Sequence, residues 1–264
     1  SSDLACNGSG GNCDNNTSNG CETDLAVSMQ HCGACGTVCP SGTTCTVGRC
    51  ATSSFAGYSV GTAPSESQWI EACTMSGRQN VMVGTDDDFF SGTLPFPVQF
   101  WGASLREWLV TSNGQVGFGN LYYGLNTIPT QAPFNSFGPL PIPAIEPLRG
   151  MFPAVYALGF DLILGSDGVC IVTVGTAPNR RWVAETRNAR LFNVTGTAFT
   201  FELIAYEGQT YFDVLYNTPW ATPFGAPVTG NEATLGTQDF RLPVRAVSYT
   251  SNVAPGTRLR YTPL

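Results

Sequence analysis

The feature that most constrains the fold of this chain is the placement of its cysteines. The first 50 residues contain eight of them: Cys6, Cys13, Cys21, Cys32, Cys35, Cys39, Cys45 and Cys50. A segment this short buries too little apolar surface to be held by packing, so covalent cross-links must replace a hydrophobic core. An even number of closely spaced cysteines is typical of disulfides formed in an oxidising compartment. We therefore expect residues 1–50 to be a loop-rich, disulfide-knotted module of a secreted protein.

The other two cysteines, Cys73 and Cys170, lie outside the module, and by elimination we expect them to bond to each other. Within the module the pairing is left open, since eight cysteines allow many arrangements. The spacing of Cys32, Cys35 and Cys39 also occurs in zinc and redox sites. A zinc ribbon needs a second matched pair, however, and a thioredoxin-like motif needs a strand-to-helix junction. The sequence shows neither, so we interpret these cysteines as structural disulfides.

After a linker at residues 51–57, residues 58–264 show the signals of antiparallel β structure. The clearest is Asn113-Gly114 between two stretches of alternating apolar side chains, because Asn-Gly readily takes positive φ at both turn positions. Further hairpins are predicted over residues 169–186 and 199–216, and shorter strands over residues 233–236, 245–249 and 258–261. No convincing amphipathic helix is evident. We therefore expect an all-β fold, an antiparallel β sandwich, with an imperfect barrel as the alternative.

A proline-rich stretch at residues 127–153 interrupts this pattern. Its seven prolines exclude a central strand, because proline removes donors from the hydrogen-bond ladder. A loop this long in a compact domain is usually functional or flexible. It is either a rigid belt that covers a sheet edge or core opening, or a contact surface for a neighbouring subunit or ligand. In the second case the interface residues are Pro129, Phe134, Phe137, Pro141 and Phe152.

Oxygen-bearing side chains alternate around the Asn19-Gly20 turn of the module. They are Asp14, Asn16, Ser18, Glu22 and Asp24. A calcium loop requires hard oxygen ligands at such spacing, closed by an acidic residue, although here the glycine lies one place later than in an EF-hand loop. The alternative is an ordinary network of Asx turns. A second acidic cluster, at residues 86–88, is either another calcium site or a solvated loop. Calcium is the only cofactor that the sequence indicates.

Side chains suited to catalysis are few. The only histidine, His31, lies beside Cys32, so a serine–histidine triad cannot be assembled in the β domain by ordinary means. The acids that glycoside hydrolysis would need are available in Asp161, Asp167, Glu185 and Glu202. Nothing in the sequence singles out two of them. We therefore expect a protein that is not an enzyme.

The net charge and the apolar stretches of the sequence limit the classes of partner and the cellular locations that we expect. The net charge of −7 disfavours nucleic acid or an anionic membrane as the main partner. The most apolar stretch, residues 151–164, is too short to span a bilayer and contains Pro153 and Asp161. The opening Ser1-Ser2-Asp3 is typical of a mature terminus left after removal of an export signal. We expect a protein that is secreted or held at the cell surface, without membrane insertion.

Two parts of the chain resemble known extracellular sequences. Residues 13–40 resemble the cysteine-rich repeat of exported myxobacterial-type surface proteins. The stretch Leu94-Pro-Phe-Pro-Val-Gln-Phe-Trp-Gly102, followed by Thr111-Ser-Asn-Gly-Gln-Val-Gly-Phe-Gly119, is similar to the opening of nidogen-like extracellular β domains. Residues 199–208 and 234–236 also fit later strands of that family. The resemblance touches most of the chain, although these motifs cover less than half of it.

The resemblance implies an extracellular β-sandwich-like domain in an adhesive or matrix context, with no catalytic residues to carry over. One segment departs from the family pattern. Relatives are expected to carry a Trp-Asp-Asp-type segment near the middle, where this chain reads Ala157-Leu-Gly-Phe-Asp161-Leu. The departure puts in doubt any ligand or metal role attached to that acidic pair.

These observations predict a structural or adhesive protein, a self-assembling cell-surface or fibre subunit. Assembly through sheet edges suits it, because unpaired edge groups template another strand and lysine, a common edge protection, is absent. The alternative is a secreted glycan- or protein-binding module, in which exposed Trp101, Trp108 or Trp220 forms the binding platform. The two differ in whether the aromatic side chains lie on an open face or are buried against a neighbour.

Overall fold

The computed structural model describes residues 6, 9–41, 43–46, 48–52, 57–119, 154–192, 194, 198–217, 234–239, 245–249, 251 and 253–264. Within these residues the only helical element is one 3₁₀ turn, η1 (Ala72–Thr74), and the remainder is strand, turn and loop. The predicted all-β fold is confirmed.

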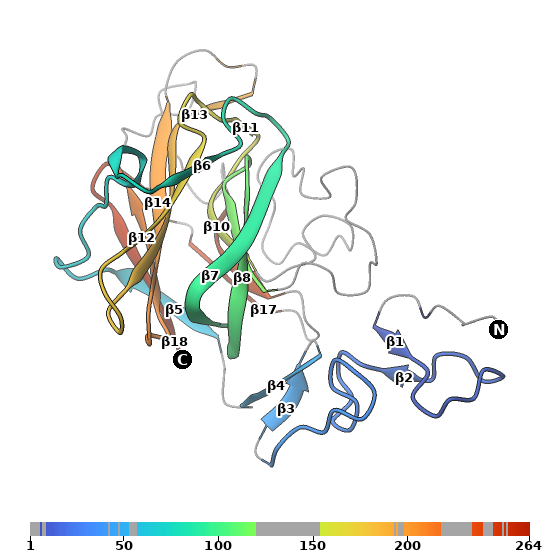
Figure 1. Ribbon diagram of the computed structural model, residues 1–264. Helices are drawn as coiled ribbons and strands as arrows, with labels where there is room; N and C mark the ends of the chain where they lie inside the picture. The colour runs from blue at the N-terminus through green and yellow to red at the C-terminus, as the bar shows by residue number, and fades with distance from the viewer. Residues whose placement is uncertain are drawn as a thin grey trace.

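Two antiparallel sheets stack face to face over the larger part of the chain (Figure 1). The first has the order β17-β16-β10-β9-β8-β7. Its strands are β7 (Phe89–Phe100), β8 (Ala103–Thr111), β9 (Gln115–Phe118), β10 (Ala154–Gly159), β16 (Thr234–Asp239) and β17 (Arg245–Ser248).

The second sheet has the order β5-β18-β15-β14-β13-β12-β6, with β11 paired to β13 beside this path. Its strands are β5 (Tyr58–Thr62), β6 (Gln79–Val81), β11 (Leu162–Ile163), β12 (Val169–Val174), β13 (Arg181–Leu191), β14 (Phe199–Tyr206), β15 (Phe212–Tyr216) and β18 (Arg258–Pro263). The arrangement is the predicted β sandwich.

Aromatic rings from both sheets fill the space between them. The ring of Trp182 on β13 lies 5.5 Å from that of Trp108 on β8 and 5.8 Å from that of Phe118 on β9. Phe100 and Phe212 meet across the core in the same way, with their centroids 5.7 Å apart. Such aromatic pairs add about 0.5–1.5 kcal/mol each beyond the burial of apolar area.

The hairpin predicted at Asn113-Gly114 joins β8 to β9, with Val110 opposite Val116. Gly114 has φ of 75°, and a Cβ there would collide with the carbonyl oxygen of Leu158. The turn therefore requires glycine for two reasons. The hairpins between β12 and β13 and between β14 and β15 are also present as predicted.

The sequence did not predict β7, which is twelve residues long and forms one edge of the first sheet. Pro95 and Pro97 lie within it, and proline usually argues against a strand. An edge strand tolerates proline because one side of its backbone has no ladder partner. The pairing with β8 also shifts register between Thr93 and Val98, around these two prolines.

The loop-rich cysteine module also contains short strands that the sequence did not predict. Two short ladders pair β1 (Gly10–Gly11) with β2 (Thr23–Asp24) and β3 (Thr43–Thr46) with β4 (Arg49–Thr52). Ala51 and Thr52 therefore belong to β4, and the predicted linker at residues 51–57 begins two residues too early. In Figure 1 these four strands lie outside the two stacked sheets.

Five disulfides join the cysteines: Cys6–Cys21, Cys13–Cys35, Cys32–Cys45, Cys39–Cys50 and Cys73–Cys170. The last is the pair expected by elimination. Cys32, Cys39 and Cys45 are buried together against Met29, so the disulfides themselves form the core of the module.

Candidate functional sites

Three carboxylates converge where the loop before β7 meets the loop between β10 and β11. The side-chain oxygens of Asp86, Asp87 and Asp161 lie within 4.8 Å of one another. Asn113, at the tip of the β8–β9 hairpin, ties the two loops together. Its Nδ2 donates to Asp87 Oδ1 at 3.4 Å, and its Oδ1 accepts the N–H of Leu162 at 2.8 Å. The hairpin tip therefore holds together the two loops that carry the acidic cluster.

The charges of this cluster are poorly compensated. Burial, and then the charge of Asp87, raises the pKa of Asp86, and burial and both neighbours raise that of Asp161. Asp86 Oδ1 is shielded from solvent and has no hydrogen-bond partner among the described atoms. Hard carboxylate oxygens at this separation are the ligands that calcium prefers. The cluster is therefore a candidate calcium site.

The cluster differs from the acidic run predicted at residues 86–88. Asp88 is exposed, and its Oδ1 accepts the N–H of Phe89 at 2.8 Å. Its place in the cluster is taken by Asp161, which the sequence offered as a possible glycosidase acid. No local signal could have joined Asp161 to Asp86, because they meet through the strand pairing of the first sheet.

The calcium loop predicted in the module takes the form of its alternative, an Asx-turn network. Asp14 Oδ1 accepts the N–H of Asn16 at 2.8 Å, and Asn16 Oδ1 accepts both the N–H and the hydroxyl of Ser18. Glu22 accepts the N–H groups of Cys13 and Asp14, and Asp24 accepts the N–H of Ala26. Calcium binding at these five residues stays a prediction.

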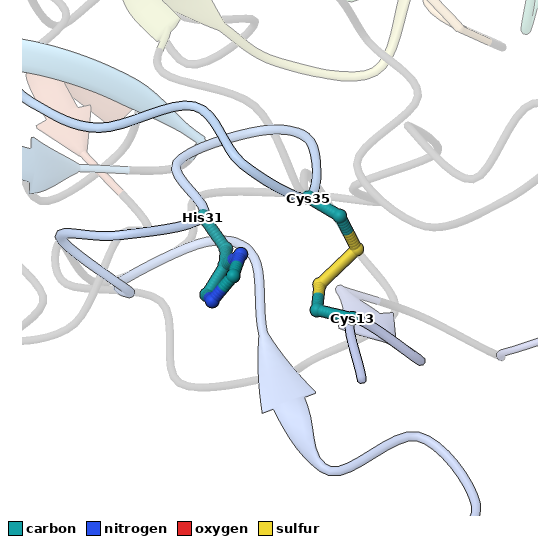
Figure 2. Close-up of side chains that lie close together, drawn as sticks. All are labelled: Cys13, His31 and Cys35. Atoms are coloured by element: carbon teal, nitrogen blue, oxygen red, sulfur yellow. A yellow bond between two sulfur atoms is a disulfide. The ribbon is translucent and has the colours of Figure 1, made fainter. Parts of the chain in front are cut away.

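The cysteines with zinc- or redox-like spacing bond to partners elsewhere. Cys32, Cys35 and Cys39 join Cys45, Cys13 and Cys50 respectively, so no two of them pair with each other. Their interpretation as structural disulfides agrees with this pattern. Figure 2 shows the imidazole of His31 beside the Cys13–Cys35 disulfide.

Two of the four candidate glycosidase acids, Glu185 and Glu202, are brought together. They are directly opposite each other on β13 and β14, and both are fully buried. They point away from the core, toward a covering segment of residues 63–78 that we call the strap. Glu202 Oε1 accepts the N–H of Ile70 at 3.0 Å, and Glu185 Oε2 accepts the N–H of Cys73 at 2.8 Å.

The strap crosses the second sheet with one anchor on each of four successive strands. Ser67 Oγ donates to Asp213 Oδ2 on β15 at 2.6 Å, and the two glutamates hold it on β14 and β13. The Cys73–Cys170 disulfide fixes it to β12. Under it lies a second apolar cluster that includes Ile70, Val183 and Ile204. The two glutamates therefore bind the backbone of the strap that covers them, and they do not face an open site that a substrate could reach.

Burial changes the ionisation of the two glutamates. It raises the pKa of Glu202 to about 9, helped by the charge of Glu185. Burial also raises the pKa of Glu185, against the opposing effect of Arg187, whose Nε donates to Glu185 Oε1 at 2.6 Å. Glu202 Oε2 has no hydrogen-bond partner among the described atoms. The raised pKa therefore favours the neutral form of the Glu202 carboxyl group at pH 7.

The predicted aromatic platform is wrong for two of its three residues. Trp101 is 1% exposed and Trp108 is 3% exposed, because both rings pack between the sheets. Trp220 lies outside the described residues, as do the predicted interface residues Pro129, Phe134, Phe137, Pro141 and Phe152.

Asp167 is the remaining candidate acid. Its backbone carbonyl oxygen accepts a hydrogen bond from the side-chain amide of Asn80.

Comparison with known proteins gives one match. A family model described as NIDO related matches residues 58–261. The curated proteins give no match to this chain. The solved structures give none either. Among the described residues, no helix has the length and apolar character needed to cross a bilayer.

Proposed function

Because this chain belongs to the NIDO-related family, we propose that it is an extracellular structural or adhesive protein that assembles with copies of itself at a cell surface or in a fibre. The five disulfides and the nidogen-like domain both indicate an extracellular location. The likeness of the module to cysteine-rich repeats of exported myxobacterial-type proteins supports a surface location in particular.

The observation that carries the proposal is the use of the buried acids. Glu185, Glu202 and Asp213 could serve chemistry by residue type, yet each holds the strap on the second sheet. Their use as anchors of a covering segment supports a structural role. The proposal therefore assigns the domain no catalytic role.

The edge of the first sheet offers a surface for assembly. The first half of β7 carries no proline, and Phe90, Ser91 and Thr93 are exposed on it. Phe90 is 39% exposed, one of few large apolar side chains at the surface of the described residues. A second copy could pair with this half of the strand, whereas Pro95 and Pro97 restrict pairing further along.

Light scattering coupled to size exclusion over a range of concentrations tests the proposal. We expect the mass of the particle to rise with concentration. Ser91→Lys with Thr93→Lys should lower that mass, because lysines on an edge oppose strand addition. Thr176→Lys with Asn179→Lys adds the same charge to the exposed β12–β13 turn and should leave assembly unchanged. A monomer at every concentration would overturn the proposal.

A further inference from the structure

Cys13–Cys35 is the only one of the five described disulfides that includes an exposed cysteine. Cys35 is exposed and Cys13 is half-buried, whereas both cysteines are buried in Cys32–Cys45 and in Cys73–Cys170. Gly33 and Gly36, with φ of 76° and 81°, form the tight turns on either side of Cys35. Cys35 therefore lies in an exposed turn of the module.

An imidazole lies against the same disulfide. The ring nitrogens of His31 offer an atom within 4.8 Å of both sulfurs, as Figure 2 shows. Its Nδ1 accepts the N–H of Gly36 at 2.9 Å, which orients the ring over the turn that carries Cys35. Because Nδ1 is the acceptor, Nε2 carries the proton in the neutral ring. The site thus combines an accessible sulfur–sulfur bond with a fixed group that can interact with a departing thiolate.

We propose that Cys13–Cys35 is a thiol-exchange site at which a small thiol forms a mixed disulfide with the module. The incoming thiolate attacks Cys35 Sγ, and the bond between the two protein sulfurs breaks. Its electron pair leaves on Cys13 Sγ, which takes up the proton that the incoming thiol lost. The products are a mixed disulfide at Cys35 and a thiol at Cys13, with no net oxidation or reduction.

His31 acts on this step as a positioning residue beside the leaving sulfur. A leaving thiolate departs faster when its negative charge is stabilised. Glu22 Oε1 accepts the N–H of Cys13 at 2.8 Å and that of Asp14 at 3.3 Å, so a carboxylate lies beside the leaving cysteine. Acidic neighbours favour a cationic thiol over an anionic one. The ligand class is therefore a small amino-thiol.

The rest of the module holds its shape when this bond opens. Cys32–Cys45 and Cys39–Cys50 form the buried core around Met29 and do not depend on Cys13 or Cys35. Exchange at the surface bond thus modifies the module without unfolding it.

Cysteamine, added to the full native chain at neutral pH, tests the proposal. The reaction is stopped with acid, free thiols are alkylated, and the peptides are mapped by mass spectrometry. We expect cysteamine on Cys35 and the alkyl label on Cys13 before any label elsewhere. If Cys6–Cys21, the other half-buried disulfide of the module, opens first or at the same rate, the proposal is wrong.

His31→Gln separates a chemical role from a structural one. It should slow opening of Cys13–Cys35 by roughly three- to ten-fold and leave the rate at Cys6–Cys21 unchanged. If the substitution merely loosened the module, both bonds would open faster. Equal rates in the variant and the parent would contradict the role of His31, and the order of labelling in the parent chain tests the site itself.

Discussion

Glu185 and Glu202 face each other across neighbouring strands with both carboxyl groups buried, and each accepts one backbone N–H from the strap. Ionising both of two neighbouring carboxyl groups that are buried away from water costs a large amount of free energy. The raised pKa of Glu202 favours its neutral form, and Arg187 Nε donates to Glu185, which partly offsets the cost of burying that carboxylate. We therefore expect the stability of the strap and of the sheet beneath it to depend on pH.

The first prediction concerns that dependence. Because the pKa of Glu202 is raised from 4.5 to about 9 in the folded state, its favourable contribution is complete below the unfolded pKa and is lost progressively as pH rises from there to the folded pKa. Between pH 5 and pH 7 this one group should lower the free energy of unfolding by on the order of 2–3 kcal/mol. Urea unfolding at a series of pH values measures it.

Glu202→Gln should remove this part of the pH dependence, since the amide keeps the neutral form. Glu66→Gln places the same change on the exposed part of the strap and should leave the pH profile as it is. Parallel profiles for the Glu202 variant and the parent would show that Glu202 is ionised when folded.

The second prediction concerns the disulfide that ends the strap. Cys73→Ser with Cys170→Ser should lower the free energy of unfolding by about 2–5 kcal/mol, because the bond closes a long loop. Hydrogen exchange should become faster at the backbone amides of residues 70 and 73, which bond to the buried glutamates in the parent chain. Unchanged exchange at these two amides would mean that the carboxylates hold the strap without the disulfide.

The third prediction concerns the acidic cluster. Calcium should raise the melting temperature, since an ion that binds only the folded state stabilises it, by about 2.7 kcal/mol at a hundred times its dissociation constant. In EDTA, Asp161→Asn should raise the melting temperature by relieving repulsion from Asp86 and Asp87, and it should abolish the response to calcium. Asp167→Asn serves as the control. Equal melting temperatures for the parent chain in calcium and in EDTA would exclude the site.

The fourth prediction concerns the glycine in the turn between β8 and β9. Gly114→Ala should cost about 3 kcal/mol or more, because the new Cβ meets the carbonyl oxygen of Leu158 in addition to the strain of positive φ. Gly208→Ala has almost the same φ, 72°, but open space around it, and should cost about 1–2 kcal/mol. If both variants lose the same free energy of unfolding, the positive φ alone explains why glycine is needed at position 114.

Local patterns accounted for the hairpins but not for the features that join distant segments. Asn113-Gly114 predicted its turn because the conformation depends on two adjacent residues. β7 was missed because Pro95 and Pro97 argue against a strand unless its edge position is known. The all-β class followed from several independent turns, so one missed strand did not change it.

The candidate sites could be predicted only in part. Asp86 and Asp87 were recognised as a cluster, but Asp161 reaches them through tertiary structure. Glu185 and Glu202 stood out only as acids, since alternation along β13 and β14 places them outside the core without revealing that the strap covers them. Trp101 and Trp108 were wrongly predicted to be exposed, because the sequence shows neither that the β7–β8 turn is buried nor which face of β8 packs against the core.

Negative-stain microscopy of the purified, fully disulfide-bonded chain at high concentration tests the central claim most directly. The account predicts fibres or ordered arrays that Ser91→Lys with Thr93→Lys abolishes and Thr176→Lys with Asn179→Lys does not. A field of separate particles, each the size of one 28.0 kDa chain, would contradict it.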